Sequence, residues 1–271
     1  MRIVRTAAAS IALATAAFSA PAMANMEEIN AAVEADYDSY LAPLFVHFHK
    51  NPELSYLENE TAKRMARELR EAGLEVTENV GGTGVVGMVR NGEGPLIMLR
   101  ADMDGLPVQE KSGLGYASMA TQVGQDGKEY PVMHACGHDV HITSMVGTAR
   151  QLMSMKDKWS GTLMFIVQPA EERVGGAKAM LADGLYDRFG KPDYALAFHV
   201  ASPLPTGIVS AAEGIQYSSS DSVDITVPGI GAHGASPHRG RDPVYIASQI
   251  VTALQSIVSR EIMPLSPAVI T

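Results

Sequence analysis

The sequence has almost no cysteine: Cys136 is the only one among 271 residues. A disulfide within the chain is therefore excluded, and the thiol must be a buried inert group, half of an intermolecular bridge, a nucleophile or a metal ligand. Basic residues are outnumbered, 21 against 30 acidic residues, which gives a formal net charge of −9. Because nucleic acids are bound by basic surfaces, this balance argues against a nucleic-acid partner.

No membrane-length hydrophobic run opens the sequence. The apolar segment at residues 6–20 is shorter than the roughly 20 residues of a membrane-spanning helix, and Pro21 follows it. We therefore expect no stable membrane anchor. Arg2 and Arg5 precede the segment and Ala22-Met23-Ala24 follows it, which is the pattern of a secretory signal peptide. The sequence predicts an exported protein, periplasmic or secreted, with cleavage after Ala24.

The hydrophobic content of 46% is enough for a full core, and apolar spacing predicts helices that alternate with strands. Helices are expected in residues 25–50, with a kink or a restart at Pro43, and in residues 59–72, 140–153, 176–183 and 244–259. Strands are expected in residues 85–89, 96–99, 162–167, 194–198, 222–227 and 268–270. The glycines of residues 91–95 favour a hairpin-like reversal between the first two strands, and Asp139 is a candidate N-cap. The pattern predicts an α/β protein.

Polar side chains follow three of the predicted strands, at the points where these strands end. Asp102 and Asp104 follow the second strand, Glu171 and Glu172 follow the third, and His199 follows the fourth. Ligands bind at this edge in open α/β sheets, so the five side chains are expected to meet there. Each has a structural explanation by itself, as a turn former, a charged helix start or a core histidine. Their equivalent positions favour a shared site.

The stretch from His134 to His141 contains the lone thiol and three histidines. Cys136 and His138 are two residues apart and can bind a metal ion as a pair. Thiolate, imidazole and carboxylate donors together suit Zn²⁺, Mn²⁺, Co²⁺ or Ni²⁺ better than Ca²⁺ or Mg²⁺. Two adjacent glutamates in extended geometry point apart, so one of them would bind the metal while the other acts as general base toward a bound water.

An alternative makes Cys136 a nucleophile that is activated by His138 or His141. This alternative leaves the carboxylates at the strand ends without a role, and we therefore favour the metal site. The earlier histidines, His47 and His49, are interpreted as packed or solvated residues at a helix end.

Five segments together resemble the motifs of the M20 metallopeptidases, specifically their amidohydrolase branch of hippurate hydrolases, N-acyl-amino-acid amidohydrolases and indole-acetyl-amino-acid hydrolases. The segments are Arg100–Pro107, His134–His141, Gln168–Glu172, Phe198–His199 and residues 231–238. The resemblance implies a zinc-exopeptidase-like, three-layer α/β catalytic domain with a mixed sheet, and a smaller α+β lid or dimerisation domain. We expect a signal peptide at residues 1–24, the N-terminal part of the catalytic domain at 25–212 and part of the lid domain at 213–271.

The resemblance also implies a role for each candidate residue. Two divalent metal ions, of Zn, Mn, Co or Ni, would be bound by Cys136, His138, Glu172 and His199, with the thiolate as a candidate bridge. The remaining roles are general base for Glu171, orientation of a metal-binding side chain for Asp104, and binding of substrate or oxyanion from the lid for His233.

The function implied by the resemblance is metal-dependent hydrolysis of the amide bond of N-acyl amino acids or short peptides. The resemblance is also compatible with a homodimer of this chain through the lid domain. The family continues after the lid with a segment that carries one more metal-binding histidine, and this sequence does not contain it. A C-terminal truncation is therefore expected. The alternative is a catalytically inactive remnant that is at most a metal- or partner-binding module.

Overall fold

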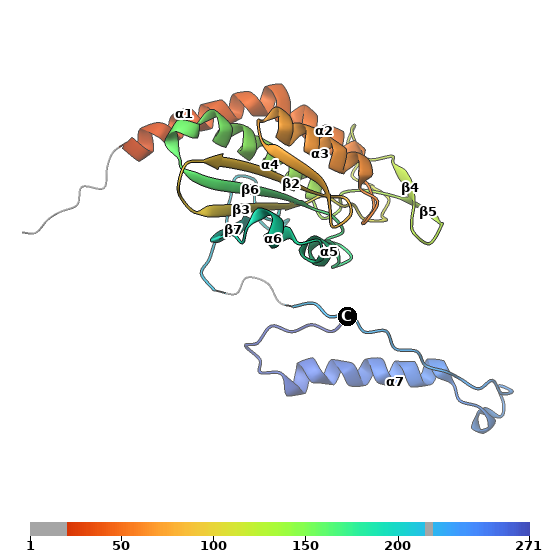
Figure 1. Cartoon of the computed structure of the whole chain (residues 1–271). Coiled ribbons are helices and arrows are strands. Elements are labelled where there is room, and N and C mark those ends of the chain that lie inside the picture. Colours follow the sequence, from red (N-terminus) through yellow and green to blue (C-terminus); the bar gives the residue numbers. More distant parts are fainter. Residues whose placement is uncertain (1–20, 215–218) are drawn as a thin grey trace, which may run out of the picture. The chain divides into compact units, whose positions relative to one another are not determined.

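The computed structural model describes residues 21–214 and 219–271. The expected signal peptide, residues 1–24, lies almost wholly outside the described residues. The chain divides into two compact units, one ending at Ser202 and the other comprising Pro203–Thr271 (Figure 1). The predicted domain extents stay a prediction.

The first unit is built on a five-stranded mixed sheet. In sheet order the strands are β1 (Glu75–Val80), β2 (Gly84–Asn91), β6 (Gly161–Gln168), β3 (Leu96–Asp102) and β7 (Tyr194–Ala197). The central strand β6 is antiparallel to β2 and parallel to β3, and β3 is parallel to β7. The strands β3, β6 and β7 therefore end at the same edge, as predicted from the polar residues that follow them.

The hairpin predicted between β2 and β3 is wrong in its pairing, because β6 lies between the two strands. Almost every side chain of β6 is buried, so the strand needs a neighbour on each side and a covered face above and below. The loop after β2 passes over the beginning of β6. There Thr162 donates its N–H to the carbonyl of Pro95, and Gly94 approaches the Gly161 backbone so closely that a Cβ would lie 2.9 Å from the Gly161 Cα.

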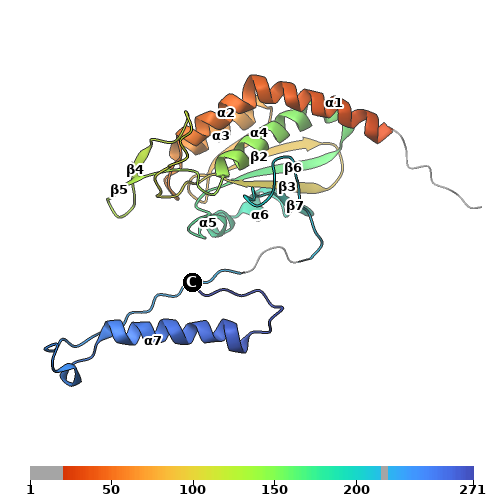
Figure 2. The same ribbon diagram turned by 180° about the vertical axis from the view of Figure 1, so that it is seen from behind.

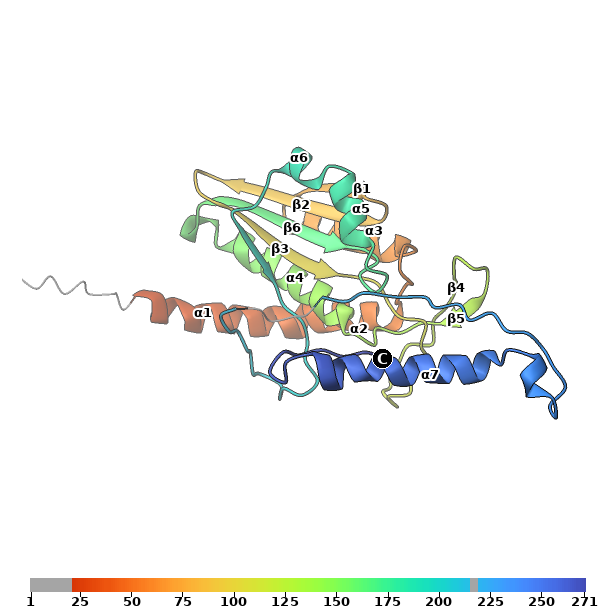
Figure 3. The ribbon, with the colours of Figure 1, turned by 90° about the horizontal axis from the view of Figure 1, so that it is seen from below.

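Helices cover both faces of this sheet (Figures 1 and 2). One face carries α2 (Ala42–Lys50), α3 (Asn59–Glu71) and α4 (His138–Ser154), whose apolar residues join the sheet in one buried cluster. The other face carries α5 (Gly176–Ala182) and α6 (Leu185–Phe189), and Figure 3 views the sheet from that side. This arrangement is the three-layer α/β fold expected from the sequence.

The alternation of side chains along the central strand explains the two layers of core. Leu163, Phe165 and Val167 of β6 pack against the cluster with α3 and α4. Met164 and Ile166 point the other way and pack with residues of α5 and α6. Successive side chains of a strand face opposite sides of a sheet, so a continuous apolar run is buried on both sides.

The N-terminal helical segment continues through Pro43 and does not restart there. The helix α1 (Pro21–Asp36) is followed by one wider turn, Tyr37–Leu41, and by α2, which has Pro43 in its first turn. Pro43 has no N–H to donate to the preceding helical turn, and the wider turn directly before it accommodates this missing bond. No helix of the described residues is long and apolar enough to cross a membrane.

The beginning of α4 differs from the sequence-based expectation. Asp139 is not the N-cap, because the helix already begins at His138. The preceding Gly137 has a φ of 83°, a left-handed conformation that glycine adopts without steric cost. This glycine turns the chain so that Cys136 and His138 both lie at the entrance of the helix.

The second unit contains the predicted helix but not the predicted strands. Helix α7 (Pro243–Ser256) begins after Asp242, whose carboxylate accepts the N–H groups of Val244 and Tyr245. Among the described residues of this unit, extended pairing is limited to one bridge, between Ile230 and Arg241. The expected strands 222–227 and 268–270 are irregular there, because an alternating sequence forms a strand only when a neighbouring strand offers its backbone groups.

A two-stranded hairpin, β4 (Thr121–Val123) with β5 (Glu129–Pro131), extends from the first unit.

The core of the first unit predicts a large difference between two leucine substitutions. Leu69 in α3 is fully buried, whereas Leu114 in a loop is 45% exposed. We expect Leu69→Ala to lower the free energy of unfolding by about 2 to 5 kcal/mol. The control Leu114→Ala should stay within about 0.5 kcal/mol of the wild type. Urea titration followed by the fluorescence of Trp159, the only tryptophan, reports on this unit, and equal losses would contradict the described core.

Candidate metal centre

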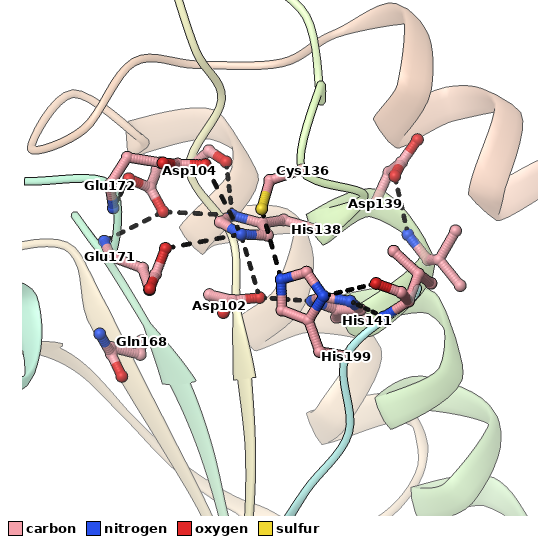
Figure 4. A network of polar contacts seen from close by, with 12 residues as sticks. Asp102, Asp104, Cys136, His138, Asp139, His141, Gln168, Glu171, Glu172 and His199 are labelled. Atoms are coloured by element: carbon pink, nitrogen blue, oxygen red, sulfur yellow. Dashed lines mark hydrogen bonds and ion pairs between the residues drawn. The ribbon is translucent and has the colours of Figure 1, made fainter. Parts of the chain in front are cut away.

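His138 is held in one tautomer by the backbone beside it. Its ring is fully buried, and Nδ1 lies 2.8 Å from the carbonyl oxygen of Asp104 (Figure 4). A carbonyl oxygen only accepts, so Nδ1 carries the proton, and in the neutral imidazole Nε2 carries the lone pair. Within the described part of the chain, this buried Nε2 has no hydrogen-bond partner. Such an atom is a preformed metal ligand, oriented by the bond on the other side of the ring.

The two glutamates face this nitrogen. The distances from His138 Nε2 are 3.8 Å to Glu171 Oε2 and 3.9 Å to Glu172 Oε1. Oε1 of Glu172 is also buried without a hydrogen-bond partner in the described residues, so two acceptor atoms face each other. A cation between them would satisfy both. The two residues lie in a turn and both side chains approach His138, so the prediction that they point apart in extended geometry is wrong. They differ in exposure, which is 39% for Glu171 and 19% for Glu172.

Cys136 and His199 form the other side of the centre. The Cys136 Sγ lies 3.3 Å from His199 Nε2, while His199 Nδ1 lies 2.6 Å from the carbonyl oxygen of Val200. The proton of this imidazole is therefore on Nδ1, and the lone pair of Nε2 faces the sulfur. The ligand atoms of Cys136, His138 and His199 lie within 4.8 Å of one another, and so do those of His138, Glu171 and Glu172. The other three predicted ligands, Cys136, Glu172 and His199, thus gather around His138.

Burial and the negative charges of Glu172 and Glu171 raise the pKa of the Cys136 thiol to about 12. A thiol with this pKa is protonated at neutral pH and is a poor nucleophile, which argues against the nucleophile hypothesis. Burial also raises the pKa of Glu172, with Glu171 and Asp104 adding to the effect while His138 opposes it. A divalent cation reverses both effects, because it stabilises the thiolate and the carboxylate.

Asp104 lies beneath the turn that carries the two glutamates. Its Oδ1 accepts the N–H of Glu171 and its Oδ2 accepts the N–H of Glu172, each at 3.1 Å. The Ser55 hydroxyl donates to Oδ2 at 2.6 Å. Burial would raise the pKa of Asp104, but the bonds from His138 and Ser55 lower it below its usual value. Asp104 therefore contacts His138 and also positions the general-base candidate.

Sequence reasoning missed Glu58, a second carboxylate that supports the same turn. Its Oε1 accepts the N–H of Ala170 at 2.7 Å, and its Oε2 accepts the Thr83 hydroxyl at 2.6 Å. The side chain is fully buried, and this burial raises the pKa of Glu58. Ala170 has a φ of 45°, which is strained for a residue other than glycine. No local pattern identifies Glu58, because the residue resembles an ordinary charge before a helix.

The interpretation of His49 as a packed or solvated residue is incomplete. The His49 ring lies 2.7 Å from Asp139 Oδ2 on one side and 3.2 Å from Glu110 Oε1 on the other. Burial lowers the pKa of His49, but the bonds to Asp139 and Glu110 outweigh burial and raise it. This network ties the first turn of α4 to the helix α2. His47 has a lowered pKa because of burial and the nearby Arg64.

His233 lies in the second unit, where its ring is exposed and Nδ1 accepts the N–H of Ala235 at 3.1 Å. Its predicted role in binding substrate or the oxyanion stays a prediction. His141, the third histidine of the central stretch, has both ring nitrogens engaged, with Asp102 and with the backbone of Val200. It is therefore unavailable as a ligand although its position in the sequence suggests one.

Comparison with known proteins agrees with this geometry. A model of the family described as peptidase family M20/M25/M40 matches residues 98–270. The chain is 45% identical over 227 residues to a hippurate hydrolase of Campylobacter jejuni, covering 82% of the chain and 55% of the relative. It is 37% identical over 246 residues to an N-acetyl-L-cysteine deacetylase of Bacillus subtilis, covering 90% of the chain and 56% of the relative. The chain spans about half the length of the curated relatives it matches.

Solved structures with similar sequences also share this fold. A protein from methicillin-resistant Staphylococcus aureus, described as an aminohydrolase, is 35% identical and superposes with a TM-score of 0.72 over 91% of this chain and 63% of its own. A Bacillus subtilis protein, described as a dinuclear metal-binding peptidase of family M20, is also 35% identical. It has a TM-score of 0.56 over 63% of this chain and 45% of its own.

The raised thiol pKa predicts slow alkylation of Cys136 when no metal is bound. At pH 8 an ordinary thiol with a pKa of about 8.5 is partly ionised, whereas a thiol with a pKa of about 12 holds far less of the reactive thiolate. After dialysis against a chelator, we expect iodoacetamide to label the folded chain at least about 100-fold more slowly than the chain unfolded in urea. Mass spectrometry measures this rate at a single site.

The control variant Glu172→Gln removes a nearby negative charge and should speed the labelling of the folded chain. Labelling of the folded wild type at the rate of the unfolded chain would contradict the described environment of the thiol. Rapid labelling that added metal does not slow would instead support a nucleophilic Cys136.

Proposed function

Because the chain belongs to the peptidase family M20/M25/M40, we propose that it is a metal-dependent amidohydrolase that cleaves the amide bond of N-acyl amino acids. One observation carries the proposal: His138 Nε2 and Glu172 Oε1 are buried and unsatisfied within the described residues, 3.9 Å apart. They lie beside the more exposed carboxylate of Glu171, so a metal site and a general base meet at the edge of the sheet.

We propose two divalent ions, of Zn, Mn, Co or Ni, held by Cys136, His138, Glu172 and His199. The donor set supports these metals, because it combines one soft thiolate with imidazoles and a carboxylate. The Bacillus subtilis relative described as dinuclear supports the number of ions. When bound, such ions lower the pKa of a coordinated water to about 7 and polarise a substrate carbonyl.

The protein residues supply the proton transfers and the orientation. Glu171 takes a proton from the attacking water and returns it to the nitrogen of the leaving amine, a task suited to a partly exposed carboxylate. Asp104 fixes Glu171 by accepting its backbone N–H, and the carbonyl of Asp104 keeps the proton of His138 on Nδ1. General base catalysis of this kind contributes roughly 10² to 10⁴ in rate.

The substrate class rests on the relatives, which are described as a hippurate hydrolase, N-acetylcysteine deacetylases, thermostable carboxypeptidases and a hydrolase of indole-acetyl-amino acids. We propose a small N-acyl amino acid or short peptide as substrate, bound with the help of His233. A homodimer through the second unit is supported by the exposed apolar residues of α7, Val244, Tyr245 and Val251.

A second candidate function is that of a metal- or partner-binding module without catalysis. The strand β7 favours it, since all four of its residues are exposed in the described structure, among them Tyr194 and Leu196. An exposed edge strand with apolar side chains is a pairing surface for another chain. Metal analysis together with amide hydrolysis by purified residues 25–271 distinguishes the two candidates.

Export is also proposed, to the periplasm or the medium. Its support is the sequence alone: two arginines, an apolar segment and the Ala22-Met23-Ala24 cleavage pattern.

Substitution of the two adjacent glutamates should separate catalysis from metal binding. Glu171→Gln should keep the metal content of the wild type and lose at least about 10² in the rate of hippurate hydrolysis, because the amide cannot accept the proton. Glu172→Gln should lose bound metal, because a neutral amide is a weaker ligand than a carboxylate. Metal content is measured by inductively coupled plasma mass spectrometry, and the rate of hippurate hydrolysis is measured by the release of glycine.

Chelator-treated wild type is the reference for both variants, and it should recover activity when Zn²⁺, Mn²⁺, Co²⁺ or Ni²⁺ is added. Unchanged turnover in Glu171→Gln would remove this residue from the mechanism. A wild type that binds metal but shows no turnover would favour the non-catalytic module.

Export predicts a mature chain that begins at Asn25. Mass spectrometry of the N-terminal peptide from periplasmic and secreted fractions should find this residue first, since cleavage follows Ala24. The control Ala24→Leu replaces the small residue at the cleavage position and should accumulate the uncleaved chain. Recovery of the wild type in the cytosol with residues 1–24 intact would contradict export.

A further inference from the structure

His141 is tied between two elements that meet at the candidate metal centre. Its Nδ1 lies 2.6 Å from Asp102 Oδ1, at the end of β3. Its Nε2 accepts the backbone N–H of Val200 at 3.0 Å, just after β7. A carboxylate accepts and an N–H donates, so the imidazole carries its proton on Nδ1 and its lone pair on Nε2. Both nitrogens are occupied, and the ring is 1% exposed.

The Asp102 end of this chain of bonds is firmly anchored. Asp102 forms an ion pair with Arg100, whose Nη1 lies 2.6 Å from Oδ2, and Arg100 Nε donates to Gln168 Oε1 at 2.8 Å. Burial would raise the pKa of Asp102, but the bond from His141 and the charge of Arg100 lower it to about 2. Asp102 is therefore a permanent acceptor, and it fixes the orientation of the His141 ring.

At the other end of this series of hydrogen bonds, Val200 orients His199. The carbonyl of Val200 accepts the proton of His199 Nδ1 at 2.6 Å, while the N–H of Val200 is held by His141. The His141 and His199 rings also pack with their centroids 4.6 Å apart. These contacts turn the ring so that His199 Nε2 faces the Cys136 sulfur (Figure 4). The preceding strand β7 is exposed and does not hold this ring by burial.

We propose that His141 is a positioning residue that orients His199 for metal binding through the backbone N–H of Val200, with Asp102 and Arg100 fixing its ring. This inference rests on the proposed function, because it takes His199 to be a metal ligand. It gives the three histidines different roles: His138 and His199 bind metal, and His141 aligns His199.

Two substitutions of His141 test its two hydrogen bonds separately. In His141→Asn the amide nitrogen lies close to the former Nδ1 and keeps the bond to Asp102, but no acceptor remains for Val200. In His141→Gln the amide oxygen reaches the former Nε2 position and can accept the N–H of Val200. If the Val200 bond matters, the Asn variant should be impaired and the Gln variant should be closer to the wild type.

The experiment is a Co²⁺ titration of the full chain, followed by the visible spectrum and by the thiolate-to-cobalt absorption of Cys136. We expect His141→Asn to raise the dissociation constant of one Co²⁺ by about 10- to 100-fold, the usual effect of losing a residue that orients a ligand. His141→Gln should lose less affinity. Thermal unfolding of each variant, with Trp159 as the probe, shows whether it is folded.

A double-mutant cycle with His199→Ala tests whether His141 affects Co²⁺ binding through His199. If His141 acts through His199, adding His141→Asn to His199→Ala should cause no further loss of Co²⁺ affinity. Additive losses, or wild-type affinity in His141→Asn, would overturn the inference. If His141→Asn does not fold, Arg100→Gln weakens the anchor of Asp102 from a greater distance and should show the same non-additive loss. A wild type that binds no Co²⁺ would contradict the proposed function and this inference with it.

Discussion

The hydrogen bond between His138 Nδ1 and the carbonyl oxygen of Asp104, 2.8 Å long, determines what the other side chains of the site can do. It fixes the proton on one side of the imidazole, which leaves the lone pair of the other nitrogen facing Glu171 and Glu172. The same Asp104 uses its carboxylate to hold the N–H groups of both glutamates. One residue just after β3 therefore contacts both His138 on α4 and the turn that follows β6.

This arrangement concentrates negative charge in a buried place. Asp102, Asp104 and Glu172 lie close to one another. The permanent positive charge beside them is the guanidinium of Arg100, which forms an ion pair with Asp102. The unbalanced charge has visible consequences, since burial and the glutamates raise the pKa of Cys136 to about 12, and burial raises the pKa of Glu172. Cys136 and Glu172 both resist ionisation when no metal is present. A divalent cation would stabilise the ionised form of each, so both groups could bind it together.

The sequence predicted the parts of the fold and site that depend on local pattern. Strand ends marked by polar residues identified Asp104, Glu171 and His199 correctly as neighbours, because parallel strands end at one edge of a sheet. The position of β6 between β2 and β3 was not predictable from the glycine-rich loop, which is compatible with either a hairpin or a crossing.

Long-range pairing and tautomers were also beyond the sequence. The stretch from His134 to His141 contains three histidines of the same residue type. Only their partners distinguish His138, a candidate ligand whose Nε2 is free within the described residues, from His141, whose two nitrogens both form hydrogen bonds. These partners are 34 to 59 residues away along the chain, so no spacing within the stretch reveals them.

The turn that carries the two glutamates also depends on a distant residue. Ala170, directly before them, adopts a φ of 45°, which costs about 1 to 3 kcal/mol for a residue other than glycine. A hydrogen bond to a carboxylate is worth about 1.5 to 3 kcal/mol, and Ala170 has such a bond to Glu58. The two contributions are of the same size, so the buried acceptor offsets the strain. The turn before Glu171 is therefore stabilised by a residue 112 positions from Ala170, and the segment that precedes α3 supports the candidate site.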